Sequence, residues 1–192
     1  MEVPSVVGLI LGAGSSRRLG RPKQTLPLRD TTLLGWVVRE VEASSLDRVV
    51  VVARHDVVAE RAEVTRPDAG DTTCSASLRA GLAAVGECDG VMLLLGDTPE
   101  VDASMIDRVR AAWEATRPWA LVTRYEDGSG HPLVFSARAL PSLRALRGEK
   151  AVWKLLESER DRTERARIER PLPRDVDSWD DYEALLEAFA LP

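Results

Sequence analysis

The sequence predicts one α/β domain, spanning residues 1–192, with a mainly parallel sheet and helices on both of its faces. Apolar runs of strand length alternate with helix-like stretches along most of the chain. Two of these runs, residues 49–52 and 91–95, are continuously apolar, as expected for strands buried on both faces. The sequence has no internal repeat, long linker or low-complexity segment, and 192 residues suffice for one substantial core.

Each expected strand is a short run of apolar or β-prone residues. The expected strands cover residues 5–11, 48–53, 63–66, 91–95, 120–123, 133–135 and 166–169. A turn-rich segment, residues 127–130, separates the fifth strand from the sixth. Right-handed crossovers between parallel strands would gather the functional loops at the carboxyl ends of these strands.

The expected helices carry apolar residues at helical spacing or begin at a capping residue. They cover residues 32–43, 57–61, 73–85, 102–115, 137–158 and 179–189. Pro141 and Gly148 are expected to break the fifth of these. Ser178 suits the N-cap of the last helix, and Asp180 and Asp181 would complement its dipole.

Composition excludes several classes of function. The chain is 44% hydrophobic and 30% charged, with a net charge of −5, so a broad basic surface for nucleic acid is not expected. No apolar run approaches the length of a membrane span, and no signal peptide is visible. Cys74 and Cys88 form neither a disulfide framework nor a metal-ligand spacing, which favours a reducing cytoplasm.

The first strand leads into a loop with the properties of a phosphate site. Gly12 and Gly14 permit a sharp turn and a close approach to a ligand, and amide groups of such a loop suit an anion. Four cations follow, at Arg17, Arg18, Arg21 and Lys23. Arg21 follows Gly20 where a P-loop would have Lys, and Arg17 replaces the third glycine of a dinucleotide fingerprint. The loop therefore favours a nucleoside triphosphate, although clustered arginines are also common on solvated surfaces.

A second chemical site is expected where the strand at residues 91–95 ends in Gly96 and Asp97. A carboxylate at the carboxyl end of a central strand lies where α/β sheets bind their ligands. Mg²⁺ is usually held by one or two carboxylates together with phosphates and water, so Asp97 is the expected magnesium ligand. Asp175 or Asp177 is a candidate second ligand. The alternative for Asp97 is a turn residue before the next helix.

Two other segments are weaker candidates. Residues 67–79 form a polar stretch that opens a helix, and it provides either ordinary capping or a second wall of the nucleotide site, which would include Gly70 and Ser75. His131, in a glycine-rich turn, is either structural or a contact to the substrate.

The residues around these sites resemble one family. Residues 11–24 (LGAGSSRRLGRPKQ) and 26–28 (LPL) are similar to the signature of small nucleotidyltransferases that attach a nucleotide to the molybdenum cofactor, the cytidylyltransferases in particular. Further resemblance lies in the segments 70–81, 96–99 (GDTP), 130–135 (GHPLVF), 146–151 and 175–178. The chain departs from the pattern at Gly12, where relatives usually have Ala, and at Ser178-Trp179, where they have Thr-Pro.

The resemblance implies a Rossmann-like nucleotidyltransferase fold, a bound nucleoside triphosphate and Mg²⁺. By position, base and phosphates would contact the loop residues, which are Leu11, Gly12, Ala13, Gly14, Ser15, Ser16, Arg17 and Arg18. Lys23 would bind the triphosphate, Asp97 the metal, and Asp177 would take the second metal position. Ala13 favours CTP, because the guanylyl-transferring branch tends to have Gly there. The implied reaction moves CMP to a molybdopterin-type acceptor and releases pyrophosphate, with Arg18 and Lys23 drawing charge from the leaving group.

Other functions stay open at this point. The same transfer chemistry would hold if GTP replaced CTP as the donor, or if another molecule replaced molybdopterin as the acceptor. A chaperone that delivers a nucleotide-bearing cofactor to a molybdoenzyme, or to that enzyme's own chaperone, would bind without turnover. An NAD(P)-dependent oxidoreductase would use Arg54, after the second strand, for a 2′-phosphate.

Overall fold

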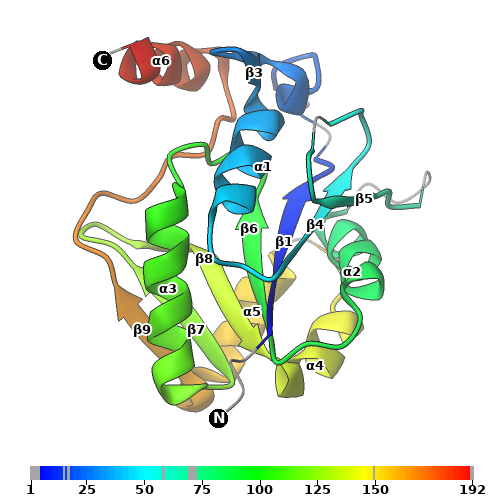
Figure 1. Cartoon of the computed structure of the whole chain (residues 1–192), viewed down its shortest axis with the longest axis vertical. Helices are drawn as coiled ribbons and strands as arrows, with labels where there is room; N and C mark the ends of the chain where they lie inside the picture. Colours follow the sequence, from blue (N-terminus) through cyan, green and yellow to red (C-terminus); the bar gives the residue numbers. More distant parts are fainter. Residues whose placement is uncertain are drawn as a thin grey trace.

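A computed structural model describes residues 5–14, 16, 18–57, 59–68, 73–148 and 150–190. Its main sheet has the strand order β5-β4-β1-β6-β8-β7-β9 (Figure 1). The strands are β1 (Val6–Gly12), β4 (Arg48–Ala53), β5 (Glu63–Thr65), β6 (Gly90–Leu95), β7 (Ala120–Arg124), β8 (Ser129–Ser136) and β9 (Thr163–Arg167). β8 runs antiparallel to its neighbours β6 and β7, and the other neighbouring pairs are parallel. The expected mainly parallel sheet is confirmed.

Helices cover both faces of the sheet (Figure 1). One face packs against α1 (Leu33–Ala43) and α3 (Ala103–Thr116), with Trp113 fully buried between α3 and the sheet. The other face packs against α2 (Cys74–Val85), α4 (Leu140–Ala145) and α5 (Ala151–Ser158). Burial on both faces explains why the central strands read as continuous apolar runs.

A third apolar cluster lies away from the sheet. The last helix, α6 (Trp179–Ala190), packs over the hairpin of β2 (Pro27–Leu28) and β3 (Thr31–Thr32), at the top of Figure 1. The buried members of this third cluster are Leu19, Leu26, Leu28, Leu33, Val176, Tyr182 and Leu185. The Tyr182 hydroxyl donates to the carbonyl of Pro27 at 2.5 Å. This packing fixes the C-terminal segment against the loop that follows β1.

Some expected elements differ in the structure. The predicted helix at 57–61 is wrong for the residues described there, because backbone N–H groups of Glu60, Arg61 and Ala62 donate to the Glu42 carboxylate instead of forming helical bonds. Pro141 lies at the start of α4, where its missing N–H is harmless, and does not break a helix. The last strand covers Thr163–Arg167 and not residues 166–169.

Short elements were not expected from the sequence. They are the β2–β3 hairpin and the three 3-10 helices η1 (Lys23–Thr25), η2 (Ala137–Ala139) and η3 (Arg160–Arg162). Among the described helices, none combines the length and apolar character that crossing a bilayer requires.

Candidate functional site

The two predicted chemical sites, which are the loop after β1 and the turn after β6, lie next to each other at the same edge of the sheet. β1 and β6 are neighbours, with Leu11 in register with Leu95, and the Gly96 N–H donates to the Leu11 carbonyl at 2.9 Å. A Cβ atom on Gly96 would lie 3.0 Å from the Gly12 Cα and 3.3 Å from the Leu11 carbonyl oxygen. Glycine at position 96 therefore lets the loop after β1 approach the turn that carries Asp97.

Gln24 orders the loop after β1. Its side-chain amide donates to the Gly14 carbonyl at 3.3 Å and accepts from the Ser16 hydroxyl at 3.4 Å. The same Ser16 hydroxyl accepts from the Lys23 N–H at 2.9 Å, and Ser16 has a positive φ of 48°. Gln24 is only 4% exposed. Sequence reasoning gave this residue no role, although Gln24 is the last residue of the segment 11–24 that resembles the family signature.

Lys23 lies between two carboxylates. Its ammonium group pairs with Asp97 and also with Asp177, the latter at 2.8 Å. The Lys23 side chain is 11% exposed. Burial lowers the pKa of Lys23, but attraction by Asp97 and hydrogen bonds to both carboxylates outweigh burial and hold the pKa above its ordinary value of 10.5. Lys23 is therefore a cation fixed at the carboxyl ends of β1 and β6.

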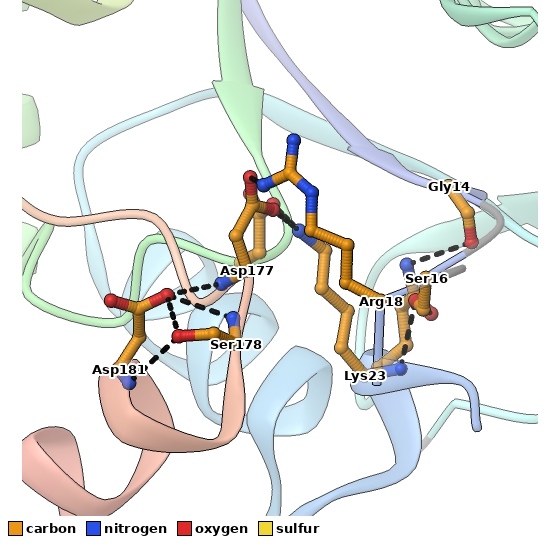
Figure 2. A network of polar contacts seen from close by, with 9 residues as sticks. Gly14, Ser16, Arg18, Lys23, Asp177, Ser178 and Asp181 are labelled. Atoms are coloured by element: carbon orange, nitrogen blue, oxygen red, sulfur yellow. Dashed lines mark hydrogen bonds and ion pairs between the residues drawn. The ribbon is translucent and has the colours of Figure 1, made fainter. Parts of the chain in front are cut away.

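Arg18 adds a second cation to Asp177. Its guanidinium donates to the Asp177 carboxylate at 2.8 Å while remaining largely exposed (Figure 2). The hydrogen bond from Lys23, above all, holds the pKa of Asp177 below its ordinary value. The sequence placed these three residues in one site, and the structure brings them into contact.

The segment that carries Asp177 is held from two directions. The Val176 N–H donates to the Asp97 carbonyl at 3.2 Å. Ser178 and Asp181 cap α6 reciprocally: Asp181 N–H donates to the Ser178 hydroxyl, and the Ser178 N–H donates to the Asp181 carboxylate (Figure 2). The expected capping role of Ser178 is confirmed. Although Ser178-Trp179 replaces the Thr-Pro of the family pattern, Asp177 still contacts Lys23.

Asp175 lies close to the same carboxylates. Burial, reinforced by the nearby charge of Asp97, raises the pKa of Asp175 to about 6. Among the described residues, no three or more His, Cys, Asp or Glu side chains are arranged to hold a metal ion on their own.

A pocket of about 230 Å³ opens beside Lys23 and Asp97. Its lining includes predicted site residues from the loop after β1 and from the end of β6, together with two residues of α2. Its lining is Leu11, Ala13, Gly14, Lys23, Gln24, Cys74, Ser77, Leu95, Gly96 and Asp97. The sequence did not single out Ser77 or Cys74, although both lie in the segment it proposed as a second wall.

Some predicted residues have other positions. Ser75 is 4% exposed, and its hydroxyl accepts from the Gly148 N–H at 2.9 Å, so its side chain joins α2 to the loop after α4. Arg54 donates to the Ala13 carbonyl at 3.2 Å. Ser15, Arg17 and Gly70 lie outside the described residues.

His131 lies in β8 and not in a free turn. Its ring contacts Trp153 edge to face, with centroids 5.9 Å apart. Burial lowers the pKa of His131 to about 4, so the imidazole is neutral at pH 7. Both rings line a second cavity, separate from the pocket beside Lys23 but sharing Leu95 with it.

Comparison with known proteins identifies the family. Residues 8–165 match the family described as the MobA-like NTP transferase domain. The chain belongs to this family. The match ends before Asp175 and Asp177, so these two carboxylates come from a part of the chain beyond the matched region.

Solved structures with 35–37% sequence identity share the whole architecture. The homologue of Mycobacterium tuberculosis Rv0371c from Mycobacterium sp. strain JC1 is 37% identical, with a TM-score of 0.87 and 96% of each chain covered. Rv0371c of M. tuberculosis, solved in complex with manganese, is 35% identical, with a TM-score of 0.83. That comparison covers 96% of this chain and 99% of the other.

Relatives known by sequence have different names. The purine catabolism protein PucB of Bacillus subtilis is 24% identical, over 82% of this chain and 83% of its own. A probable molybdenum cofactor guanylyltransferase of Opitutus terrae is 28% identical, over 79% and 78%. The nicotine blue oxidoreductase of Paenarthrobacter nicotinovorans is also 28% identical, over 74% and 76%. Family and fold together make this MobA-like chain a nucleotidyltransferase, as the sequence predicted.

Proposed function

We propose that this MobA-like protein transfers CMP from CTP to a phosphorylated, molybdopterin-type acceptor and releases pyrophosphate, with Mg²⁺ as its cofactor. The observation that carries the proposal is the position of Lys23, whose ammonium lies between Asp97 and Asp177 at a pocket formed by the loop after β1. A fixed cation beside two carboxylates can receive a triphosphate together with its metal ion.

The chemistry requires positioning more than covalent help. An oxygen of the acceptor phosphate attacks the α-phosphorus of CTP, a new P–O bond forms, and the bond to the β-phosphate breaks. The electron pair leaves with pyrophosphate. Lys23 and Arg18 supply the positive charge that stabilises this leaving group. The acceptor phosphate is ionised near neutral pH, so no side chain needs to act as a general base.

The donor set fits a hard divalent cation. Asp97 and Asp177 present carboxylate oxygens to one cationic group, Lys23, and such oxygens are the ligands that Mg²⁺ prefers. When bound there, the ion would neutralise phosphate charge. Lys23 would then exchange its carboxylate partners for phosphate oxygens. The manganese complex of Rv0371c supports a divalent ion in this family.

Ala13 favours CTP over GTP. It is 3% exposed and lines the pocket, so a base bound there meets a methyl group where the guanylyl-transferring branch tends to have glycine. GTP is the alternative nucleotide, and the relative named as a guanylyltransferase supports it. An oxidoreductase function is the second candidate, because one relative carries that name.

The proposal is tested by thermal melting with CTP, GTP, ATP and NADPH, each with and without Mg²⁺. A ligand at a hundred times its Kd stabilises by about 2.7 kcal/mol, which for this chain length raises Tm by about 5–11 °C. We expect this rise for CTP with Mg²⁺ and its loss in Asp97→Asn. A response to GTP alone would overturn the nucleotide assignment, and a response to NADPH alone would favour the oxidoreductase. Binding of CTP without pyrophosphate release in the presence of acceptor would favour a cofactor chaperone.

A further inference from the structure

Asp177 holds both of the cations to which the proposed function assigns the phosphates. One of its carboxylate oxygens accepts from the Lys23 ammonium and the other from the Arg18 guanidinium, each at 2.8 Å (Figure 2). A phosphate group binds two cations in the same way, because its separate oxygens each accept a charge-assisted hydrogen bond. The Asp177 carboxylate therefore makes the contacts that an anionic ligand of this site would make.

The two carboxylates that pair with Lys23 differ in exposure and origin. The Asp97 side chain is 18% exposed and lines the pocket beside Lys23. The Asp177 side chain is 47% exposed, does not line that pocket, and reaches Lys23 from the segment before α6. A half-exposed ion pair costs little to open, because water solvates the separated charges. Asp177 is therefore the carboxylate that an incoming anion can displace from Lys23.

The backbone around Asp177 is fixed even though its side chain is half-exposed. Val176 is buried, and its N–H donates to the Asp97 carbonyl at 3.2 Å. The Asp177 N–H donates to the Asp181 carboxylate at 3.1 Å. A carboxylate displaced by rotation of its side chain would thus stay close to Lys23 and Arg18. Such a tethered group competes at an effective concentration that the tether sets, whatever the concentration of anions in solution.

We propose that Asp177 is a specificity residue, which occupies Lys23 and Arg18 so that polyanions without a divalent cation bind weakly. A triphosphate that carries a divalent cation brings positive charge for the displaced carboxylate to face, whereas a bare triphosphate brings only negative charge. The inference rests on the proposed function and adds that Asp177 selects metal-complexed nucleotide over free polyanions.

The test measures binding of tripolyphosphate to the full chain by isothermal titration calorimetry, in EDTA. We expect Asp177→Asn to bind it about fivefold more tightly than the unaltered chain, because a neutral amide competes less for the two cations. Asp180→Asn is the matched control, since it removes the same charge from an exposed position three residues away. In the described part of the chain, Asp180 pairs with neither Lys23 nor Arg18, so this variant should bind like the unaltered chain.

A second titration, with CTP in Mg²⁺ and in EDTA, measures the selectivity itself. The ratio of the two affinities should be smaller in Asp177→Asn than in the unaltered chain. The inference is overturned if Asp177→Asn binds tripolyphosphate no more tightly than the unaltered chain, or if its affinity ratio for CTP is unchanged. It is also overturned if Asp180→Asn tightens binding equally, because net charge alone would then explain the effect.

Failure of the proposed function would have a different signature. In that case neither tripolyphosphate nor CTP with Mg²⁺ would bind to the unaltered chain or to either variant. Failure of the inference alone would leave the binding of CTP with Mg²⁺ to the unaltered chain intact, and only the contrast between Asp177→Asn and Asp180→Asn would be missing.

Discussion

Lys23 and Asp177 are 154 positions apart in the sequence, yet the Lys23 ammonium donates to the Asp177 carboxylate at 2.8 Å. The contact joins the loop after β1 to the segment before α6, and Asp97 completes it from the end of β6. Three distant parts of the chain thus place one cation and two anions at the pocket where we propose that the triphosphate binds. The apolar cluster beneath α6 holds this arrangement together.

Lys23→Met should reduce turnover about 10²–10³-fold, the usual effect of removing one charge-stabilising donor. Methionine keeps most of the length of the side chain but leaves Asp97 and Asp177 without their shared cation. The measurement is kcat/KM for CTP by pyrophosphate release. Lys154→Met, which removes an exposed lysine from α5, is the control and should retain normal turnover. Equal turnover in the two variants would contradict the role given to Lys23.

Asp177→Asn should lower stability at neutral pH by a small amount. The native pKa of Asp177 lies below its ordinary value of 3.8, so its ionised form stabilises the fold above that pH, and this contribution is lost as pH falls through the native pKa. Because the side chain is half-exposed, we expect a loss of about 0.5–1 kcal/mol at pH 7. Urea unfolding at pH 7 and at about pH 3 should show the difference from the unaltered chain shrinking in acid. Asp180→Asn, at the same helix start, is the control; a deficit that grows in acid would refute this account.

Gly96→Ala should destabilise the protein by about 1–3 kcal/mol, because the added methyl group meets backbone atoms of Leu11 and Gly12 that cannot rotate away. It should also weaken nucleotide binding, since Asp97 follows directly. At Gly14 a Cβ atom would make only an ordinary contact of 3.6 Å with Gln24, so Gly14→Ala should keep stability within about 0.5 kcal/mol. Chemical unfolding of both variants measures the contrast, and equal stabilities would contradict the close approach of β1 and β6.

Gln24→Leu should raise the KM for CTP more than it lowers kcat. The substitution leaves the Gly14 carbonyl and the Ser16 hydroxyl without their buried partner, at a cost of about 1–3 kcal/mol. The loop would lose its fixed shape, while Lys23 and Asp97 would remain. Gln24→Glu keeps an acceptor for Ser16 but lacks the amide donor to Gly14, so it should restore only part of the affinity. A pure loss of kcat in both variants would show that Gln24 does not act by ordering the loop.

The sequence predicted most of the architecture because short continuous apolar runs such as residues 49–52 and 91–95, bounded by polar and turn residues, are typical of strands covered on both faces. It also predicted that Asp97 lies near the loop after β1, since the carboxyl ends of neighbouring parallel strands meet at one edge of a sheet. The helix expected at 57–61 failed because Glu42, distant in sequence, binds the backbone of that segment. A local sequence pattern does not show that a distant carboxylate will accept the hydrogen bonds of these backbone N–H groups.

The details of the site depended on contacts between distant segments. Asp177 was a candidate metal ligand, but only the packing of α6 on the β2–β3 hairpin shows how it reaches Lys23. Ser75 carried the same sequence signal as Ser77, yet the turn of α2 points Ser75 to Gly148 and Ser77 to the pocket. Gln24 lies in the signature-like segment 11–24, but its role was not predicted, because that role depends on the Gly14 carbonyl and the Ser16 hydroxyl in the folded loop.

The most direct test of the central claim is a crystal structure of this chain with CTP and Mn²⁺, whose anomalous scattering locates the ion. The account predicts a manganese peak at the Asp97 carboxylate, the triphosphate along the loop after β1, and the Lys23 ammonium moved from the carboxylates to phosphate oxygens. Nucleotide bound elsewhere, or bound while Lys23 stays between Asp97 and Asp177, would contradict it.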